Sequence, residues 1–160
     1  MTLTHIPLGA PGQVYRSPMP FSRFDANGRL LKAYQDAGVQ VVVMLSSDAE
    51  GLERAGKDLR KAYAAAGMQV IYFPIEDFGV PGDLKGLNEA LNAAIAQALT
   101  GKHLAVHCLA GLGRTGMFLA LMARRLLRVN GRRAIEYVRE YLPGAVQTEE
   151  QTQLVIEDRG

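Results

Sequence analysis

The stretch that decides the fold is HLAVHCLAGLGRTGMFLAL, residues 103–121. Its first five residues form an apolar run that is typical of a buried strand. A loop with spaced glycines follows, and from residue 115 the apolar residues recur at helical spacing. The loop therefore lies at a helix N-terminus, where unpaired backbone N–H groups and the helix dipole favour a bound anion.

Outward from this stretch, strand-like and helix-like runs alternate. Three further apolar runs predict strands at residues 13–16, 39–45 and 68–75. Helical patterns cover residues 27–37, 51–66, 84–99, 115–129 and 132–141, and a last helix starts near Thr148. We expect Asp83 to cap the third helix and Asn130-Gly131 to end the fourth. The prediction is an α/β fold: a single domain, residues 1–160, with a mostly parallel central sheet of about four to five strands flanked by helices.

Composition excludes several classes of protein. The chain has 160 residues, of which 48% are hydrophobic and 21% charged, so it is neither disordered nor fibrous. Its formal net charge of +2 gives no reason to expect nucleic acid as a partner. No apolar run reaches the roughly 20 residues of a membrane span, and no secretory signal is recognisable at the N-terminus. We expect a cytoplasmic monomer that spans no membrane.

The chain has one cysteine, Cys108, which excludes an intrachain disulfide and a thiolate-rich metal site. Cys108 opens the glycine-spaced loop and Arg114 closes it. The residues between them present backbone amides that can surround a phosphate: Leu109, Ala110, Gly111, Leu112 and Gly113. The same amides and the helix dipole favour a thiolate, and the forked guanidinium of Arg114 suits two phosphoryl oxygens. These residues indicate a cysteine nucleophile beneath a bound phosphoryl group.

Two residues flank this constellation. His107 precedes Cys108 on a strand, where neighbouring side chains point to opposite faces. We therefore expect His107 to order the loop backbone by a hydrogen bond, not to act as the base for the thiol. Thr115 follows Arg114 and is expected to cap the helix, to donate its hydroxyl to the sulfur, or both.

The string HCLAGLGRTG, residues 107–116, resembles the His-Cys-x5-Arg-Ser/Thr-Gly signature of the cysteine-dependent protein tyrosine and dual-specificity phosphatases. Ten consecutive positions fit. Three other segments are similar to the first strand, the general-acid loop and the late glutamine motif of that family: VYRSPMP (14–20), IEDFGVP (75–81) and AVQTEEQTQLV (145–155). The resemblance thus spans nearly the whole chain.

The resemblance implies further roles. Displacement of an alkoxide or phenoxide needs a proton donor, and Asp77 matches the family's general acid. Its neighbour Glu76 stays open as the alternative. Gln147 and Gln151 would position the water that hydrolyses the phosphocysteine intermediate, with Asp77 as the base. No metal or other cofactor is implied.

The sequence therefore predicts a protein phosphatase that hydrolyses phosphotyrosine, and in addition phosphoserine or phosphothreonine if the pocket is shallow. Its partner is a phosphorylated protein or another phosphomonoester. Alternatives are the same chemistry on an RNA 5′-triphosphate or a phosphoinositide, and a phosphate-binding module with weak catalysis. GLGRTG (111–116) also fits a dinucleotide-binding G-x-G-x-x-G, with Glu136 as the ribose ligand. That hypothesis leaves Cys108 and Arg114 unexplained.

Overall fold

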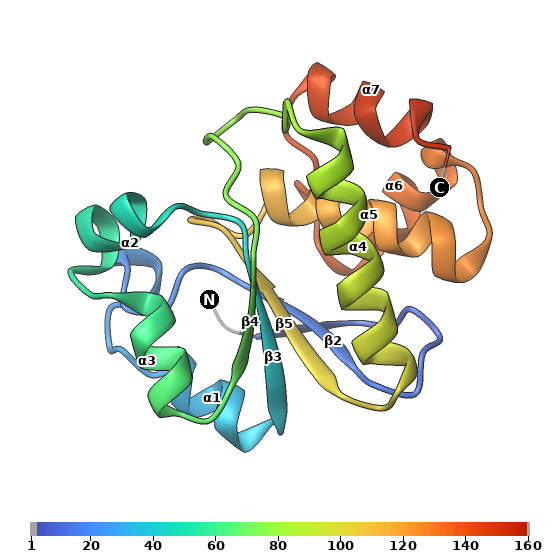
Figure 1. Cartoon of the computed structure of the whole chain (residues 1–160). Coiled ribbons are helices and arrows are strands. Elements are labelled where there is room, and N and C mark those ends of the chain that lie inside the picture. The colour runs from blue at the N-terminus through green and yellow to red at the C-terminus, as the bar shows by residue number, and fades with distance from the viewer. Residues whose placement is uncertain (1–2, 160) are drawn as a thin grey trace.

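A sheet of five strands runs through the middle of the computed structural model, which describes residues 3–159 (Figure 1). The strands are β1 (Thr4–Ile6), β2 (Val14–Ser17), β3 (Val39–Met44), β4 (Gln69–Tyr72) and β5 (His103–His107), in the spatial order β1-β2-β5-β3-β4. Only β1 is antiparallel to its neighbour. The predicted mostly parallel sheet is confirmed, although the short strand β1 was not predicted. The predicted domain limits, residues 1 and 160, lie outside the described residues.

Helices cover both faces of the sheet. They are the 3₁₀ helix η1 (Arg23–Asp25) and the α-helices α1 (Leu30–Asp36), α2 (Asp48–Ala55), α3 (Leu59–Ala65), α4 (Leu84–Leu99), α5 (Gly113–Leu127), α6 (Gly131–Tyr141) and α7 (Glu149–Glu157). Helices α1 and α3 lie on one face, and α4, α5 and α6 lie on the other (Figure 1). Within residues 3–159 there is no helix whose length and apolar character would allow it to cross a membrane.

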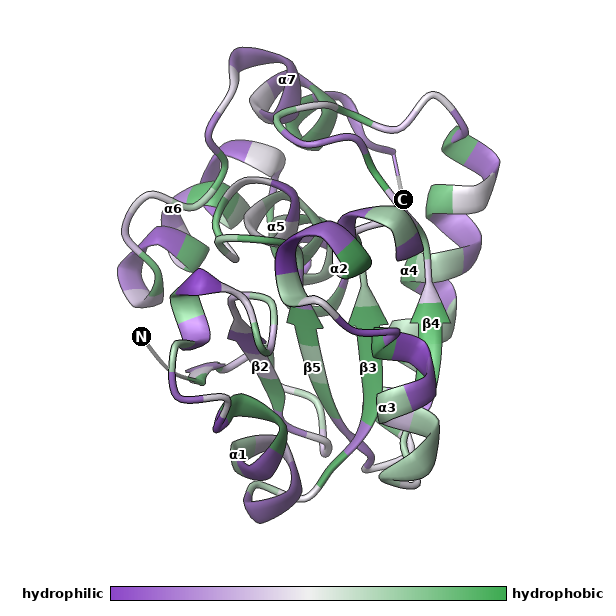
Figure 2. Ribbon diagram, turned by 90° about the vertical axis from the view of Figure 1, so that its left-hand side faces the viewer, coloured by the Kyte–Doolittle hydropathy of each residue, from purple (hydrophilic) through white to green (hydrophobic). Residues whose placement is uncertain are grey.

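The inner strand β3, which lies between β5 and β4, supplies side chains to both layers. Val41 and Val43 pack on the side of α4 and α5, while Val42 and Met44 pack on the side of α1 and α3. All four side chains are fully buried, because successive residues of a strand point to opposite faces and helices cover each face. In Figure 2 the strands β3, β4 and β5 are mostly coloured as hydrophobic, whereas β2 is largely coloured as hydrophilic. Each such side chain stabilises the fold by about 1.5–3 kcal/mol relative to an exposed one.

Two predicted helix boundaries were wrong. The single helix expected at residues 51–66 is two helices, because Gly56 ends α2 in the left-handed conformation and the Asp58 side chain caps α3. Helix α5 ends at Leu127, before the expected stop at Asn130-Gly131, because the next residue, Arg128, adopts the left-handed conformation. Asn130 instead begins the next helix, accepting a hydrogen bond from the backbone N–H of Arg133.

Helix α4 has the predicted bounds and the predicted cap, in which Asp83 accepts from the backbone N–H of Gly86. Its buried stripe includes Leu87 and Leu91, but Leu84 and Leu99 at its two ends are 54% exposed. The hydrophobic periodicity therefore predicted the position of the helix correctly. Its first and last turns are less buried than its middle, because the helix extends beyond the part of the sheet and of α5 on which it packs.

The parallel strands end together at one edge of the sheet. There β5 leads into Cys108, β3 leads into α2, and β4 leads into the loop that contains Asp77. Helix α5 begins at the same edge and is buried from Gly113 to Ala123. In open α/β sheets the carboxyl ends of the strands form the usual ligand site, and the residues singled out by sequence meet at this edge.

Candidate active site

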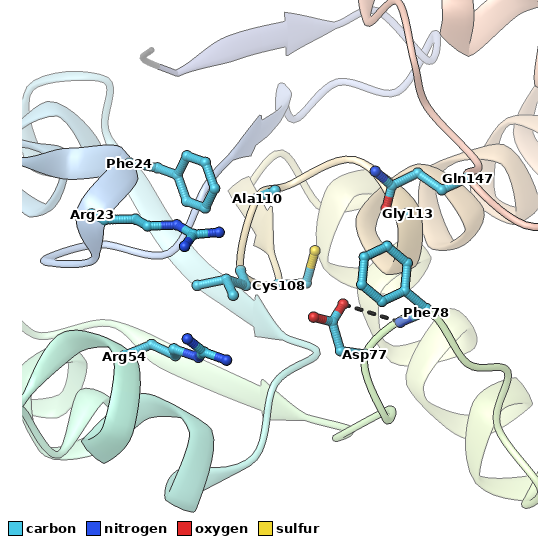
Figure 3. A pocket seen from close by; sticks show the side chains of 10 residues that line it. Arg23, Phe24, Arg54, Asp77, Phe78, Cys108, Ala110, Gly113 and Gln147 are labelled. Atoms are coloured by element: carbon cyan, nitrogen blue, oxygen red, sulfur yellow. Dashed lines mark hydrogen bonds between the residues drawn. The ribbon is translucent and has the colours of Figure 1, made fainter.

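A pocket of about 240 Å³ opens at the carboxyl edge of the sheet (Figure 3). It is lined by Arg23, Phe24, Arg54, Asp77, Phe78, Cys108, Leu109, Ala110, Gly113 and Gln147. Cys108 is 3% exposed and its sulfur points into the pocket, with Asp77 and Phe78 on the facing wall (Figure 3). Residues far apart in sequence, predicted separately, therefore share one small cavity.

The Cys108 loop, residues 108–112, connects β5 to α5 and is held from behind by Arg16 of β2. The Arg16 side chain is fully buried. Its Nε donates to the Gly111 carbonyl (3.0 Å) and its Nη2 donates to the Ala110 carbonyl (2.8 Å). Because the C=O and N–H of a trans peptide point in opposite directions, these bonds turn the amides of residues 111 and 112 away from Arg16. A side chain at Gly111, whose φ is +79°, would collide with the Ser17 carbonyl.

Arg114 lies in the first turn of α5, and its guanidinium is 1% exposed. Its two terminal nitrogens donate to the two carboxylate oxygens of Glu50, each at 2.8 Å. Nη1 also donates to the Ile75 carbonyl, and Nη2 lies 3.1 Å from Asp77 Oδ1. Burial is the largest single influence and lowers the pKa of Arg114, but the hydrogen bond to Glu50 and the charges of Cys108, Glu50 and Asp77 together outweigh it, so the pKa is raised. Of the three guanidinium nitrogens of Arg114, the buried Nε has no hydrogen-bond partner within residues 3–159.

The predicted acid loop lies between β4 and α4. Asp77 lines the pocket and its side chain is 43% exposed, whereas Glu76 is exposed outside the pocket lining. Asp77 Oδ1 accepts from the backbone N–H of Phe78 at 3.0 Å. Phe78 itself has a φ of 61°, in the left-handed region that non-glycine residues seldom adopt. This conformation presents the Phe78 ring at the pocket mouth (Figure 3).

His107 is fully buried beneath the Cys108 loop. Its Nδ1 donates to the Cys108 carbonyl at 3.0 Å, so its Nε2 accepts from the Tyr63 hydroxyl at 2.7 Å. Burial, the largest influence, lowers the pKa of His107 to about 4. The neutral ring contacts the backbone of the loop, in the manner expected of a residue that orders it.

We expect acidification to destabilise the fold through His107. Between its ordinary pKa near 6.5 and the folded value near 4, the unfolded chain binds a proton on this side chain that the folded chain does not, so stability falls as the pH falls. At pH 5 the loss relative to pH 7 is about 2 kcal/mol. The variant His107→Asn keeps a donor for the Cys108 carbonyl but does not titrate. Urea unfolding of both proteins at the two pH values measures the difference, and equal losses would contradict the prediction.

The two glutamines occupy different environments. Gln147 lines the pocket beside Gly113. Gln151 is fully buried, and its Oε1 accepts from the backbone N–H groups of Gln147 (3.0 Å) and Thr148 (3.2 Å). Its Nε2 donates to the Gly79 carbonyl on the acid loop at 3.1 Å. Gln147 thus faces the pocket, while Gln151 joins its backbone to the acid loop.

Thr115 does not cap α5. The N-cap position is Leu112, without a side-chain hydrogen bond, and Thr115 lies inside the first turn. Its hydroxyl is buried and has no hydrogen-bond partner in residues 3–159, the Cys108 sulfur included. The cap hypothesis is wrong because the helix begins two residues earlier, at Gly113.

Sequence reasoning missed several residues of the site. Glu50 follows β3 by a few residues, so its place at the carboxyl edge was a signal that could have been used. Nothing in the local sequence pairs it with a residue 64 positions later. The other residues missed are Arg16 behind the loop and Arg23, Phe24, Arg54 and Phe78 around the pocket mouth.

A known protein family matches the part of the chain that contains most of this site. The model of the Tc-R-P family, whose description is "Polymorphic toxin system, DSP-PTPase phosphatase", matches residues 21–127, which is more than half of the chain and includes the Cys108 loop. The chain belongs to this family. This places it in the superfamily of protein tyrosine and dual-specificity phosphatases. Glu136, the acid of the dinucleotide-site hypothesis, lies within α6 and not at the end of a strand.

Two relatives give the extent of the similarity. An uncharacterized protein of Methanocaldococcus jannaschii is 39% identical to the phosphatase over 89 residues, covering 54% of this chain and 57% of that protein. The protein tyrosine phosphatase domain-containing protein 1 of Mus musculus is 29% identical over 137 residues, which are 81% of this chain and 18% of that protein. The chain spans about half the length of the two Methanocaldococcus jannaschii proteins that it matches.

Solved structures share the fold. The active form of Tk-PTP is 28% identical, with a TM-score of 0.78 and coverage of 95% of this chain and 93% of that one. The kinase associated phosphatase, crystallised with serine in place of its catalytic-site cysteine, has a TM-score of 0.86 at 20% identity and covers 97% and 92% of the two chains. At 20% identity, the similarity to the kinase associated phosphatase shows only that the two chains share a fold.

Proposed function

We propose that the phosphatase hydrolyses phosphotyrosine on proteins through a phosphocysteine intermediate. The observation that carries this proposal is the position of Cys108, with its sulfur in the pocket at the start of α5 and Asp77 on the facing wall. The loop amides, Arg16 behind them and the dipole of α5 favour an anion above the sulfur. The unpartnered Nε of Arg114 supplies a further donor.

In the first step the Cys108 thiolate attacks phosphorus. An S–P bond forms as the P–O bond to the substrate breaks, and Asp77 gives its proton to the leaving oxygen. Arg114 and the amides of the Cys108 loop stabilise the charge on the equatorial oxygens. Glu50, which holds both terminal nitrogens of Arg114, positions that guanidinium.

In the second step a water molecule attacks the phosphocysteine. The side chain of Gln147 positions the water, and the Asp77 carboxylate, now without its proton, accepts one from it. The S–P bond breaks, phosphate leaves and the Cys108 thiolate is restored. Gln151 acts indirectly, since its amide joins the backbone of Gln147 to the acid loop at Gly79.

The pocket mouth favours an aromatic phosphoester. Phe24 of η1 and Phe78 of the acid loop stand on two sides of the cavity (Figure 3). Phe78 is 62% exposed and so available for contact with a substrate. A phenyl ring on the phosphoryl oxygen would contact both side chains, and each aromatic pair contributes about 0.5–1.5 kcal/mol. A threonine side chain cannot make these contacts.

A panel of substrates assayed side by side tests the substrate class. It contains matched phosphotyrosine and phosphothreonine peptides, a phosphoinositide and an RNA 5′-triphosphate. We expect kcat/KM for the phosphotyrosine peptide to exceed that for every other substrate by at least about tenfold. Phe24→Leu and Phe78→Leu should each lower the ratio of phosphotyrosine to phosphothreonine turnover by about threefold. A higher kcat/KM for the lipid or the RNA would reject the proposal while leaving the phosphatase chemistry intact.

A further inference from the structure

Two arginines line the pocket outside the Cys108 loop. Arg23 belongs to η1 and Arg54 to α2, and both side chains extend toward the cavity from the side away from Asp77 and Phe78 (Figure 3). Both residues are exposed. Arg23 lies over the ring of Phe24 at 4.9 Å, and Nε of Arg54 is 4.0 Å from the exposed carboxylate of Glu53. Over residues 3–159, neither guanidinium has a closer carboxylate partner.

The backbone that carries Arg54 is fixed by the catalytic arginine. Glu50 lies one helical turn before Arg54 on α2, so the two side chains share a face of the helix. The bidentate bond from Arg114 to Glu50 sets the rotation of α2 about its axis. The same contact therefore turns Arg54 toward the pocket.

The backbone that carries Arg23 is fixed by a buried acid. The Asp25 carboxylate accepts from the backbone N–H groups of Phe21 (2.8 Å) and Arg29 (3.0 Å). Ser22 caps the short helix η1 from the other side. Arg23 thus extends from a closed, hydrogen-bonded turn, which limits the conformational entropy that binding would cost.

Arg23 and Arg54 differ from Arg114 in that no buried or half-buried carboxylate of residues 3–159 compensates their charge. Arg114 contacts the carboxylates of Glu50 and Asp77, which compensate its positive charge. The phosphoryl group of a substrate would lie beside Arg114, and the cationic side chains that line the pocket next to it are Arg23 and Arg54. Guanidinium groups bind carboxylates through paired N–H donors.

We propose that Arg23 and Arg54 form a second anion subsite that binds an acidic side chain next to the phosphotyrosine of the substrate. This inference rests on the proposed function and refines its substrate class to phosphotyrosine in an acidic segment of protein. The aromatic walls favour a peptide over a lipid headgroup, because a phenyl ring connects the phosphoryl group to the backbone that carries the acidic residue.

The test compares two phosphotyrosine peptides that differ only in the residues flanking the phosphotyrosine, which are glutamate in one and alanine in the other. We expect the wild type to have the higher kcat/KM with the acidic peptide. Arg23→Gln and Arg54→Gln should each lower the acidic-to-neutral ratio by about threefold, the effect of one exposed ion pair. The preference should also shrink as NaCl is raised, because salt screens exposed charges. Arg132→Gln removes an equal charge from α6, outside the pocket, and serves as the matched control.

Binding of the same peptides to a Cys108→Ser protein separates this inference from the proposed function. If the phosphatase turns over neither peptide, the proposed function fails, while a binding preference that depends on Arg23 and Arg54 still supports the subsite. Equal losses for both peptides would mean that the arginines only attract the phosphoryl group, and the subsite would be rejected. The subsite would also be rejected if binding of phosphoinositide vesicles depended on both arginines while binding of the acidic peptide did not.

Discussion

Replacing Cys108 with serine removes turnover of an aryl phosphate, with an expected loss of at least about 10⁵-fold, of the order seen when other enzymes lose their nucleophile. The hydroxyl occupies the same place in the pocket but is not ionised at neutral pH, so it cannot attack phosphorus without a base. The imidazole next to it in the sequence, that of His107, is engaged by Tyr63 and the Cys108 carbonyl.

The fold and phosphate binding should survive this change. Cys108 is 3% exposed, and serine is slightly smaller, so the Arg16 and His107 contacts to the loop backbone are kept. Phosphopeptide affinity and the thermal unfolding midpoint of Cys108→Ser are the controls for an intact site. Turnover above a hundredth of the wild-type rate, in protein free of contaminating phosphatase, would reject the phosphocysteine mechanism.

Replacing Asp77 with asparagine should slow turnover of a poor leaving group by about 10²–10³-fold, within the range for loss of a general acid. With a good leaving group, such as a nitrophenoxide, we expect a loss of less than about tenfold. The reason is that a stable phenoxide departs without a proton, whereas a tyrosine phenoxide needs one. A series of aryl phosphates of graded leaving-group acidity gives this dependence directly, as the slope of log kcat/KM.

The neighbouring acid offers a matched control. Glu76 is exposed and lies outside the pocket lining, one residue from Asp77. Glu76→Gln removes the same charge from the same loop and should leave the slope unchanged. If Asp77→Asn slows good and poor leaving groups equally, or if Glu76→Gln changes the slope, the acid is not Asp77.

Local sequence was sufficient for the elements whose signals lie within a few residues. The strand β5 and the helix α4 have the predicted bounds, since a short apolar run and a capped amphipathic stripe depend on near neighbours. The same reasoning failed at residues 51–66, where Gly56 and Asp58 separate two helices within one continuous helical pattern. It failed again at Thr115, because the start of a helix depends on the backbone path of the preceding loop.

The residues of the site likewise fall into those that local sequence predicted and those that only the tertiary structure brought in. The signature at residues 107–116 placed Cys108 and Arg114 at a helix N-terminus without any knowledge of the fold, because strand, loop and helix are consecutive in the chain. The sequence alone thus determined the family signature and, from it, the chemistry that we propose. Only the tertiary structure decided what surrounds it: Glu50 on the Arg114 fork, Arg16 behind the loop, and Arg23 and Arg54 at the pocket mouth. These contacts join residues dozens of positions apart, and they form only because parallel strands bring their carboxyl ends to one edge of the sheet.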